Sequence, residues 1–377
     1  MPPRPFAINV PDSVLEDLRQ RLANTRSPNP IPNTGWEFGA DMAYIKELCS
    51  YWKDEFDWRR HEAALNAYPQ FLSAIDGVDI HYWHVKGRGP NPFPLILVHG
   101  WPGSIYEFQQ LIGPLTDPAA HGGDPADSFD VVIPALPGFG FGGHPQERGW
   151  GPSRMAAAFN ELMVRELGYE RYGTQGGDWG GIITARMGAV HSRHIAGVHL
   201  NFVISRPAEG DDSPEARTAA AARAKFLAIE AGYQSIQETK PMSLAAAQAD
   251  SPAGIAAWIV EKFRAWSDCD GDVESVFTKD QLITNTMFYW APNSIASAAR
   301  IYYEDRVEPG DFSSTRIEAP VGVAVFPKEI WPSPRAWCEA RYNIQRWTEF
   351  PKGGHFPAME RPQELLDDVR AFYRRIR

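Results

Sequence analysis

Apolar and polar residues in the first 75 positions recur with the period of a helix. Ser13 and Glu16 match a capping box that would begin the first helix. The apolar residues that share one face of it are Val14, Leu15, Leu18 and Leu22. Three prolines interrupt the pattern, which resumes over residues 42–51 and 58–65. We therefore predict a helical N-terminal region, residues 1–75, that wraps around the main body.

After position 80 the pattern changes to short apolar runs that end in glycine-rich turns and alternate with helical patterns. Such an alternation is typical of βαβ units and of a mostly parallel sheet flanked by helices. The predicted strands are residues 80–85, 95–98, 131–135, 172–175, 198–203, 321–326 and 342–350. The sequence thus predicts an α/β fold.

No such apolar run appears between residues 205 and 311. This segment contains helical patterns, the clearest over residues 216–231, 252–266 and 293–303. We interpret residues 205–311 as a helical lid inserted between the two core segments, residues 76–204 and residues 312–377.

The composition is that of a globular protein, with 44% hydrophobic and 22% charged residues. No stretch approaches the ~20 apolar residues of a transmembrane helix, and the N-terminus has no apolar segment typical of a signal peptide. We expect a cytoplasmic protein without a membrane partner. The net charge of −10, without a Lys/Arg run, argues against nucleic acid as a partner. Three scattered cysteines without CxxC spacing predict neither a metal site nor disulfides, and no cofactor is indicated.

One glycine-rich turn carries an acidic residue at the centre. Residues 176–180 read Gly-Gly-Asp-Trp-Gly, after the predicted strand 172–175 and before a helical pattern. This matches the nucleophile elbow, in which small residues permit a strained turn that raises one side chain above the sheet. Here that side chain is Asp178. Taken alone the pentapeptide is more often an ordinary turn, so its interpretation depends on other motifs.

A second motif, His99-Gly100-Trp101-Pro102-Gly103-Ser104, follows the predicted strand 95–98. In hydrolases with a nucleophile elbow, such a loop supplies one backbone N–H to the oxyanion hole, and the residue after the nucleophile supplies another. These donors would be Trp101 and Trp179, which we also expect, with Pro102, to contact substrate. A cis bond before Pro102 would turn the loop inward. We interpret His99 as structural.

The third motif is a late histidine in a glycine-rich loop, His355 in Gly353-Gly354-His355. The chain order Asp178, acid, His355 is that of α/β-hydrolase triads. Glu329, after the strand 321–326, is the predicted acid, and Asp311 is the reserve candidate. Three motifs in this order predict an α/β-hydrolase fold with a helical lid and a helical N-terminal extension.

These residues resemble the microsomal-type epoxide hydrolases almost from end to end. The segments that carry the resemblance include Pro5-Phe6, Phe56-Asp57-Trp58, the loop 99–104, Pro137-Gly138-Phe139-Gly140, residues 175–180, Thr284-Asn285 with Tyr289-Trp290, Phe326-Pro327-Lys328-Glu329 and Gly353-Gly354-His355-Phe356. The resemblance implies Asp178 as nucleophile, His355 as base and Glu329 as its acid partner. With no N-terminal anchor evident, the chain resembles the soluble microbial members, which often form homodimers.

The resemblance also implies that two lid tyrosines, Tyr233 and Tyr302, donate hydrogen bonds to the epoxide oxygen. Tyr303 is adjacent, so the register at the second tyrosine is a prediction to be tested. The implied reaction converts a small-molecule epoxide and water to a vicinal diol through an ester on Asp178. Natural-product, lipid and xenobiotic epoxides all remain open as substrates.

Two alternatives remain. A haloalkane dehalogenase shares the aspartate nucleophile but needs a halide cradle, which Trp101 and Trp179 could form. A non-catalytic ligand-binding homologue would be expected to lack a triad residue, and none is missing. A serine esterase is excluded because no serine occupies the elbow.

Overall fold

The computed structural model describes residues 2–309 and 315–377. Its centre is a nine-stranded sheet in the order β1-β2-β3-β5-β4-β6-β7-β8-β9. The strands are β1 (Arg4–Phe6), β2 (Gln70–Ile75), β3 (Val78–Val85), β4 (Phe93–Val98), β5 (Phe129–Pro134), β6 (Tyr172–Gly176), β7 (Ile195–Leu200), β8 (Ile317–Val325) and β9 (Tyr342–Glu349). From β5 to β9 every neighbouring pair is parallel. All seven strands predicted from apolar runs are present, and the predicted α/β-hydrolase fold is confirmed.

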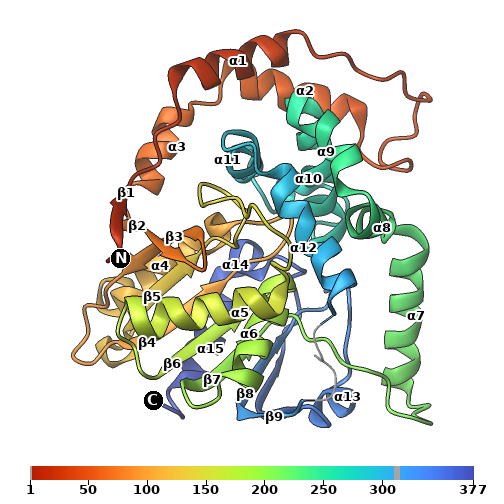
Figure 1. Ribbon diagram of the computed structural model, residues 1–377. Coiled ribbons are helices and arrows are strands. Elements are labelled where there is room, and N and C mark those ends of the chain that lie inside the picture. The colour runs from red at the N-terminus through yellow and green to blue at the C-terminus, as the bar shows by residue number, and fades with distance from the viewer. Residues whose placement is uncertain (1, 310–314) are drawn as a thin grey trace.

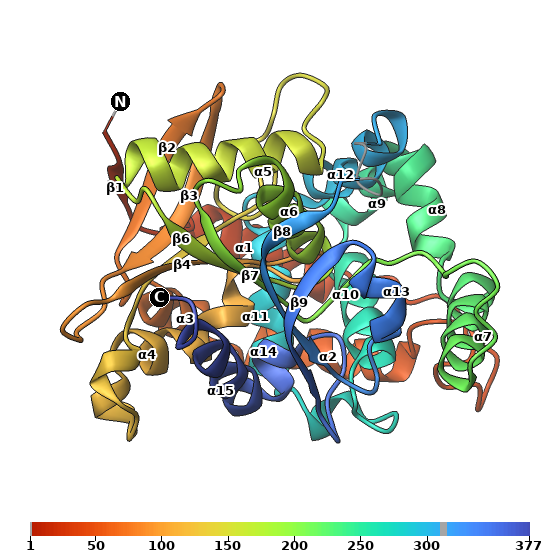
Figure 2. The ribbon, with the colours of Figure 1, turned by 90° about the horizontal axis from the view of Figure 1, so that it is seen from below.

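The central strands are buried on both faces, as their unbroken apolar runs require. All four residues from Leu95 to Val98 in β4 have no exposed surface. Helices α5 (Pro152–Glu161) and α6 (Asp178–Val190) cover one face, and α4 (Gln109–Thr116) and α15 (Pro362–Tyr373) cover the other (Figure 2). Two short helices, α13 (Arg335–Glu339) and α14 (Pro357–Glu360), complete the core.

The prediction that residues 1–75 are helical is wrong at both ends of this region. Strand β1 pairs antiparallel with β2, which pairs antiparallel with β3, so the region contributes two strands to the sheet. Three residues in β1 are too few to show an alternating pattern. Strand β2 is recognisable as a strand only when β3 lies beside it, since pairing and not sequence period determines it.

Between these strands lie the three predicted helices, α1 (Asp12–Ala23), α2 (Met42–Asp54) and α3 (Trp58–Leu65). They arch over the top of the molecule and reach the lid (Figure 1). In α1 the buried residues are Leu15, Leu18 and Leu22, which belong to the predicted apolar face. The predicted capping box is wrong, because α1 begins at Asp12, and Pro11 precedes it without a side-chain cap. The Asp12 carboxylate pairs with Arg59 instead.

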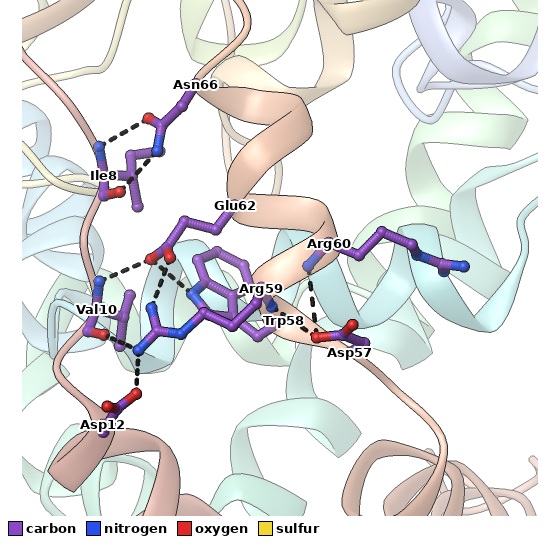
Figure 3. A network of polar contacts seen from close by, with 9 residues as sticks. All are labelled: Ile8, Val10, Asp12, Asp57, Trp58, Arg59, Arg60, Glu62 and Asn66. Atoms are coloured by element: carbon purple, nitrogen blue, oxygen red, sulfur yellow. Dashed lines mark hydrogen bonds and ion pairs between the residues drawn. The ribbon is translucent and has the colours of Figure 1, made fainter.

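A buried carboxylate ties the N-terminal arm to α3 (Figure 3). Glu62 accepts hydrogen bonds from the backbone N–H of Val10 at 2.7 Å and from Trp58 Nε1 at 3.0 Å. Arg59 donates to the other Glu62 oxygen at 2.5 Å and to the Val10 carbonyl at 2.7 Å. These contacts satisfy the backbone N–H and carbonyl groups of Val10, which lies outside the strands of the sheet.

The lid consists of six α-helices and one short 3-10 helix, η5 (Val273–Ser275), in the described part of residues 205–311. The α-helices are α7 (Pro214–Ile229), α8 (Gly232–Thr239), α9 (Pro241–Asp250), α10 (Pro252–Trp266), α11 (Lys279–Trp290) and α12 (Ile295–Val307). Helix α10 packs against α1 and α2, so the N-terminal region supports the lid from outside (Figure 1).

Among the described residues, no helix combines the length and apolar character needed to cross a membrane. The three cysteines, Cys49, Cys269 and Cys338, are buried free thiols.

Candidate active site

Asp178 lies at the sharp turn between β6 and α6. Its φ of 49° is left-handed, a conformation uncommon for a residue with a side chain. The turn also requires close backbone approach, because a Cβ on Gly180 would lie 1.8 Å from the carbonyl oxygen of Val98. The local geometry is therefore that of the predicted elbow, with the Asp178 carboxylate at the carboxyl end of β6.

The loop after β4 closes over this carboxylate. The Trp101 backbone N–H donates a hydrogen bond of 2.8 Å to Asp178 Oδ1. A Cβ on Gly100 would lie 2.2 Å from the same oxygen, so glycine is needed for this approach. The Trp101–Pro102 peptide bond is cis. Trp179 follows Asp178 directly, and the donor role of its N–H stays a prediction.

The contacts of His99 are those of a structural residue. Its Nε2 accepts a hydrogen bond from the Leu136 N–H at 3.1 Å, and its Nδ1 lies 2.9 Å from the Gly100 carbonyl oxygen. Burial lowers the pKa of His99 to about 4, so the ring is neutral and holds the loop with both nitrogens.

His355 lies between the two acids predicted to flank it. Its Nδ1 is 2.6 Å from Glu329 Oε1, and its Nε2 is 3.4 Å from Asp178 Oδ2. A bridge between Lys328 and Gly354 sets the two loops side by side, which brings residues 26 positions apart into contact. The structure thus brings Asp178, Glu329 and His355 together. Asp311, the reserve acid, lies outside the described residues.

Electrostatics favour a charged His355 in the free protein. Burial opposes the charge, but the carboxylates of Glu329 and Asp178 outweigh it and raise the pKa of His355 well above its ordinary value. The imidazolium is therefore held between two negative groups. Any reaction that neutralises Asp178 removes part of this stabilisation and makes His355 a better proton donor.

A partly buried carboxylate, that of Glu360, fixes the loop that carries His355. It accepts hydrogen bonds of 2.9 Å from the N–H groups of Gly354, Phe356 and Asp268. Sequence reasoning missed this residue. It could have been found from its position at the end of α14, one turn after the His355 loop. A carboxylate there can accept hydrogen bonds from backbone N–H groups that have no partner within the helix.

The two lid tyrosines lie above Asp178. Tyr233 on α8 and Tyr302 on α12 are 6% and 4% exposed, with ring centroids 5.8 Å apart. With Asp178 and Trp179 they line a cavity of about 200 Å³. Tyr302 Oη is buried without a hydrogen-bond partner among the described residues. Tyr303 is only half-buried, so the predicted register agrees with the geometry.

Burial raises the pKa of both phenols well above the ordinary value, and the Asp178 charge raises it further. Both tyrosines therefore keep their protons at neutral pH. Their rings pack on the two tryptophans: Tyr233 stacks on Trp101 at 4.9 Å, and Tyr302 meets Trp179 edge to face at 4.8 Å. The packing fixes both rings at the wall of the cavity.

Lid helix α11 anchors the loop that contains Trp101. Asn285 donates to the Pro102 carbonyl at 2.8 Å and accepts from Ser104 Oγ at 2.8 Å. The Tyr289 hydroxyl donates to the Gly103 carbonyl at 2.5 Å. Sequence reasoning noted Asn285 and Tyr289 in family motifs but gave them no role, because the contacts join segments about 180 positions apart.

Comparison with known proteins gives two family models. The model for the epoxide hydrolase N terminus matches residues 3–108, and that for the alpha/beta hydrolase fold matches residues 94–220.

Curated relatives match over almost the whole chain. One is a protein of Stigmatella aurantiaca that is provisionally named an epoxide hydrolase. It is 42% identical to this chain over an alignment of 377 residues, which covers 99% of this chain and 85% of that protein. Epoxide hydrolase 1 of Oryctolagus cuniculus is 35% identical, with 98% of this chain and 88% of that protein covered. Such relatives do not favour a dehalogenase or a non-catalytic binding protein.

Solved structures agree. The juvenile hormone epoxide hydrolase of the silkworm Bombyx mori has a TM-score of 0.91 at 28% identity, covering 99% of this chain and 94% of that chain. The Aspergillus niger epoxide hydrolase has a TM-score of 0.90 at 30% identity, covering 100% and 97%. The similarity extends over N-terminal region, core and lid alike, and the chain belongs to the microsomal-type family of epoxide hydrolases.

Proposed function

We propose that this epoxide hydrolase acts through a covalent ester on Asp178, with His355 and Glu329 activating the hydrolytic water. The arrangement of groups around the Asp178 carboxylate is the observation that supports this proposal. The carboxylate of Asp178, bound by the Trp101 N–H and adjacent to His355, lines one cavity together with two buried protonated phenols. A carboxylate can displace a strained carbon–oxygen bond, and the phenols can stabilise the departing oxygen.

In the first step, Asp178 Oδ2 attacks an epoxide carbon. Oδ1 is the oxygen bound by Trp101, which leaves Oδ2 as the nucleophile. The new carbon–oxygen bond forms as the ring carbon–oxygen bond breaks, and its electron pair passes to the ring oxygen. Tyr233 and Tyr302 donate hydrogen bonds to that oxygen, and one phenol transfers its proton to it. The phenolate regains a proton from the His355 imidazolium, which releases one once Asp178 is esterified, so the imidazole enters the second step neutral. The product is a hydroxyalkyl ester of Asp178.

In the second step, His355 removes a proton from water, and the resulting hydroxide attacks Cγ of the ester. Glu329 orients the imidazole through Nδ1 and stabilises its positive charge. The backbone N–H groups of Trp101 and Trp179 bind the tetrahedral oxyanion. Collapse of this intermediate breaks the Cγ–Oδ2 bond, and the departing diol oxygen takes the proton of the newly formed carboxyl group, which restores the Asp178 carboxylate.

Oxygen-18 labelling tests the ester directly. With enzyme in excess over epoxide in oxygen-18 water, a single turnover should give unlabelled diol, because its new oxygen comes from Asp178. The peptide that contains Asp178 should gain the label, and Asp178→Asn should form no ester. Label in the first-turnover diol, with none in the peptide, would falsify the nucleophilic role of Asp178.

We propose a small-molecule epoxide as the substrate, which the largely apolar lining of the cavity supports. A homodimer and a cytoplasmic location stay predictions from the sequence.

A further inference from the structure

Glu107 is a partly buried acidic residue that the two proposed steps do not use. It lies in the short helix η1 (Ile105–Phe108), directly after the loop that carries Trp101. Burial raises the pKa of Glu107 to about 8, and the Asp178 charge adds to the effect while His355 opposes it. At neutral pH the side chain is mainly an uncharged carboxylic acid, which can both donate and accept a hydrogen bond.

The Glu107 carboxyl lies against the loop that carries Trp101, beside Gly103. A Cβ placed on Gly103 would lie 1.4 Å from Glu107 Oε1, so the carboxyl occupies the space directly over that glycine. Because residue 103 is a glycine, there is room at this place for the carboxyl group of Glu107, four residues later in the chain. This arrangement holds the acid against the loop that binds Asp178 Oδ1.

A small cavity connects this acid to the reacting groups. Its volume is about 10 Å³, close to the minimum for one water molecule. The residues that line it include Trp101, Glu107, Gly177, Asp178, Asn201 and His355. It thus lies on the side of Asp178 that faces His355, away from the larger cavity under the tyrosines.

We propose that this cavity is the site of the hydrolytic water and that Glu107 is a further catalytic residue that orients it. The proposal rests on the ester mechanism above. One water proton points to His355 Nε2, the other is accepted by the Glu107 carboxyl, and an oxygen lone pair then faces Cγ of Asp178. During attack the first proton moves to His355, and the second stays on the new oxygen. Glu107 exchanges no proton, and as a neutral acid it adds no second negative charge beside the oxyanion.

Two substitutions separate hydrogen bonding from packing. Glu107→Leu keeps much of the volume but cannot bind water, and should slow ester hydrolysis roughly 10- to 100-fold while ester formation changes by less than about threefold. Glu107→Gln retains an uncharged carbonyl acceptor and should stay within about fivefold of wild type in both steps. Single-turnover kinetics with quenched-flow mass spectrometry measure epoxide loss, ester and diol separately. The ester should accumulate only in Glu107→Leu.

Gly103→Ala provides an independent test, because its methyl group would displace the Glu107 carboxyl without removing it. We expect slow hydrolysis in this variant, and little further loss when it is combined with Glu107→Leu, since both changes remove the same contact. If Glu107→Leu does not fold, Gly103→Ala and Glu107→Gln still test the proposal. Glu62→Gln, a buried carboxylate of the N-terminal region, serves as the control and should leave both rate constants unchanged.

The outcomes distinguish the two proposals. Hydrolysis within about threefold of wild type in Glu107→Leu, or equal slowing of both steps, would overturn the role of Glu107 and leave the ester mechanism intact. If Glu107→Gln and Glu107→Leu both fold and both slow ester hydrolysis equally, the proposed role of Glu107 is also overturned. If wild-type enzyme converts epoxide without any ester, the proposed mechanism itself fails.

Discussion

The two oxygens of the Asp178 carboxylate have different neighbours, and this difference assigns them different tasks. Oδ1 is fixed by the Trp101 N–H, while Oδ2 lies 3.4 Å from His355 and faces the reacting side. In the proposed ester, Oδ1 becomes the carbonyl oxygen and is already in place for the oxyanion. A single backbone hydrogen bond thus prepares both steps.

Replacing tyrosine with phenylalanine in α12 tests whether Tyr302 or its neighbour Tyr303 donates the hydrogen bond to the epoxide oxygen. Tyr302→Phe should slow ester formation by roughly one to three decades, because a developing oxyanion loses one donor. Tyr303→Phe removes the same atom from the next residue and should have little effect, since Tyr303 is only half-buried. Stopped-flow measurement of ester formation gives both rates. A slow Tyr303 variant beside a normal Tyr302 variant would shift our assignment by one position.

The charge on His355 predicts a pH dependence for ester hydrolysis. Esterification neutralises Asp178 and so lowers the raised pKa of His355, but the Glu329 charge still raises it. Hydrolysis needs the neutral ring, so its rate should increase with pH and level off above that pKa. In Glu329→Gln the midpoint should move to lower pH, and the plateau should fall roughly 10- to 100-fold.

Decay of preformed ester, followed across a pH series, measures this midpoint. An unchanged midpoint in Glu329→Gln would contradict the assignment of Glu329 as the charged partner of His355.

At the scale of elements, the active site depends on contacts between lid and core. Helix α11 binds the loop after β4 through Asn285, while α8 and α12 place the tyrosines over α6. The N-terminal helices pack on α10 and so hold the lid from its outer side. Displacement of one lid helix would therefore disturb the oxyanion loop as well as the phenols.

Asn285→Leu tests this link. The change leaves the Pro102 carbonyl without its donor and the Ser104 hydroxyl without its acceptor, which should reduce the free energy of unfolding by about 1–3 kcal/mol. Because the loop also orients Asp178, both chemical steps should slow by roughly tenfold or more. Thr286→Val is the matched control, since that hydroxyl bonds only within α11, to Leu282. Denaturant unfolding and single-turnover rates provide the two measurements. Normal rates in Asn285→Leu would show that the loop is positioned independently of the lid.

At the scale of the whole molecule, one buried ionic cluster joins the far edge of the sheet to the terminal helix. Asp368 on α15 lies 2.9 Å from His199 on β7 and accepts a hydrogen bond of 2.7 Å from Arg346 on β9. Burial alone would raise the pKa of Asp368, but His199 and Arg346 outweigh it and lower the pKa to about 2. The cluster therefore favours the folded state above the ordinary aspartate pKa.

Asp368→Asn should destabilise the protein by roughly 2–4 kcal/mol at neutral pH, because it removes the buried carboxylate that pairs with Arg346 and contacts His199. The difference from wild type should shrink as the pH falls from about 4 toward 2, where wild-type Asp368 also becomes protonated. Urea unfolding at several pH values measures this. Asp367→Asn, exposed on the same helix, should change stability by less than about 0.5 kcal/mol. A difference that persists undiminished at acid pH would contradict the ionic origin.

Features that depend on nearby residues could be predicted from the sequence alone. The seven predicted strands, the elbow at Asp178 and the glycine-rich loop of His355 are local patterns, because burial on both faces and tight turns restrict the residues that can form them. Glu329 could be predicted from its position after the strand 321–326 and from the chain order of triads, whereas the lid tyrosines came only from the family resemblance, because no local pattern distinguishes them from other aromatics.

Only the tertiary structure determined the features that join distant segments. Strands β1 and β2 exist because β3 lies beside them, and Asn285 holds a loop about 180 positions away. The raised pKa of Glu107 likewise depends on burial and on the charge of Asp178, neither of which is a property of its own segment. The physical reason is the same in each case: a hydrogen bond, a strand pairing or a pKa depends on which groups are adjacent in space.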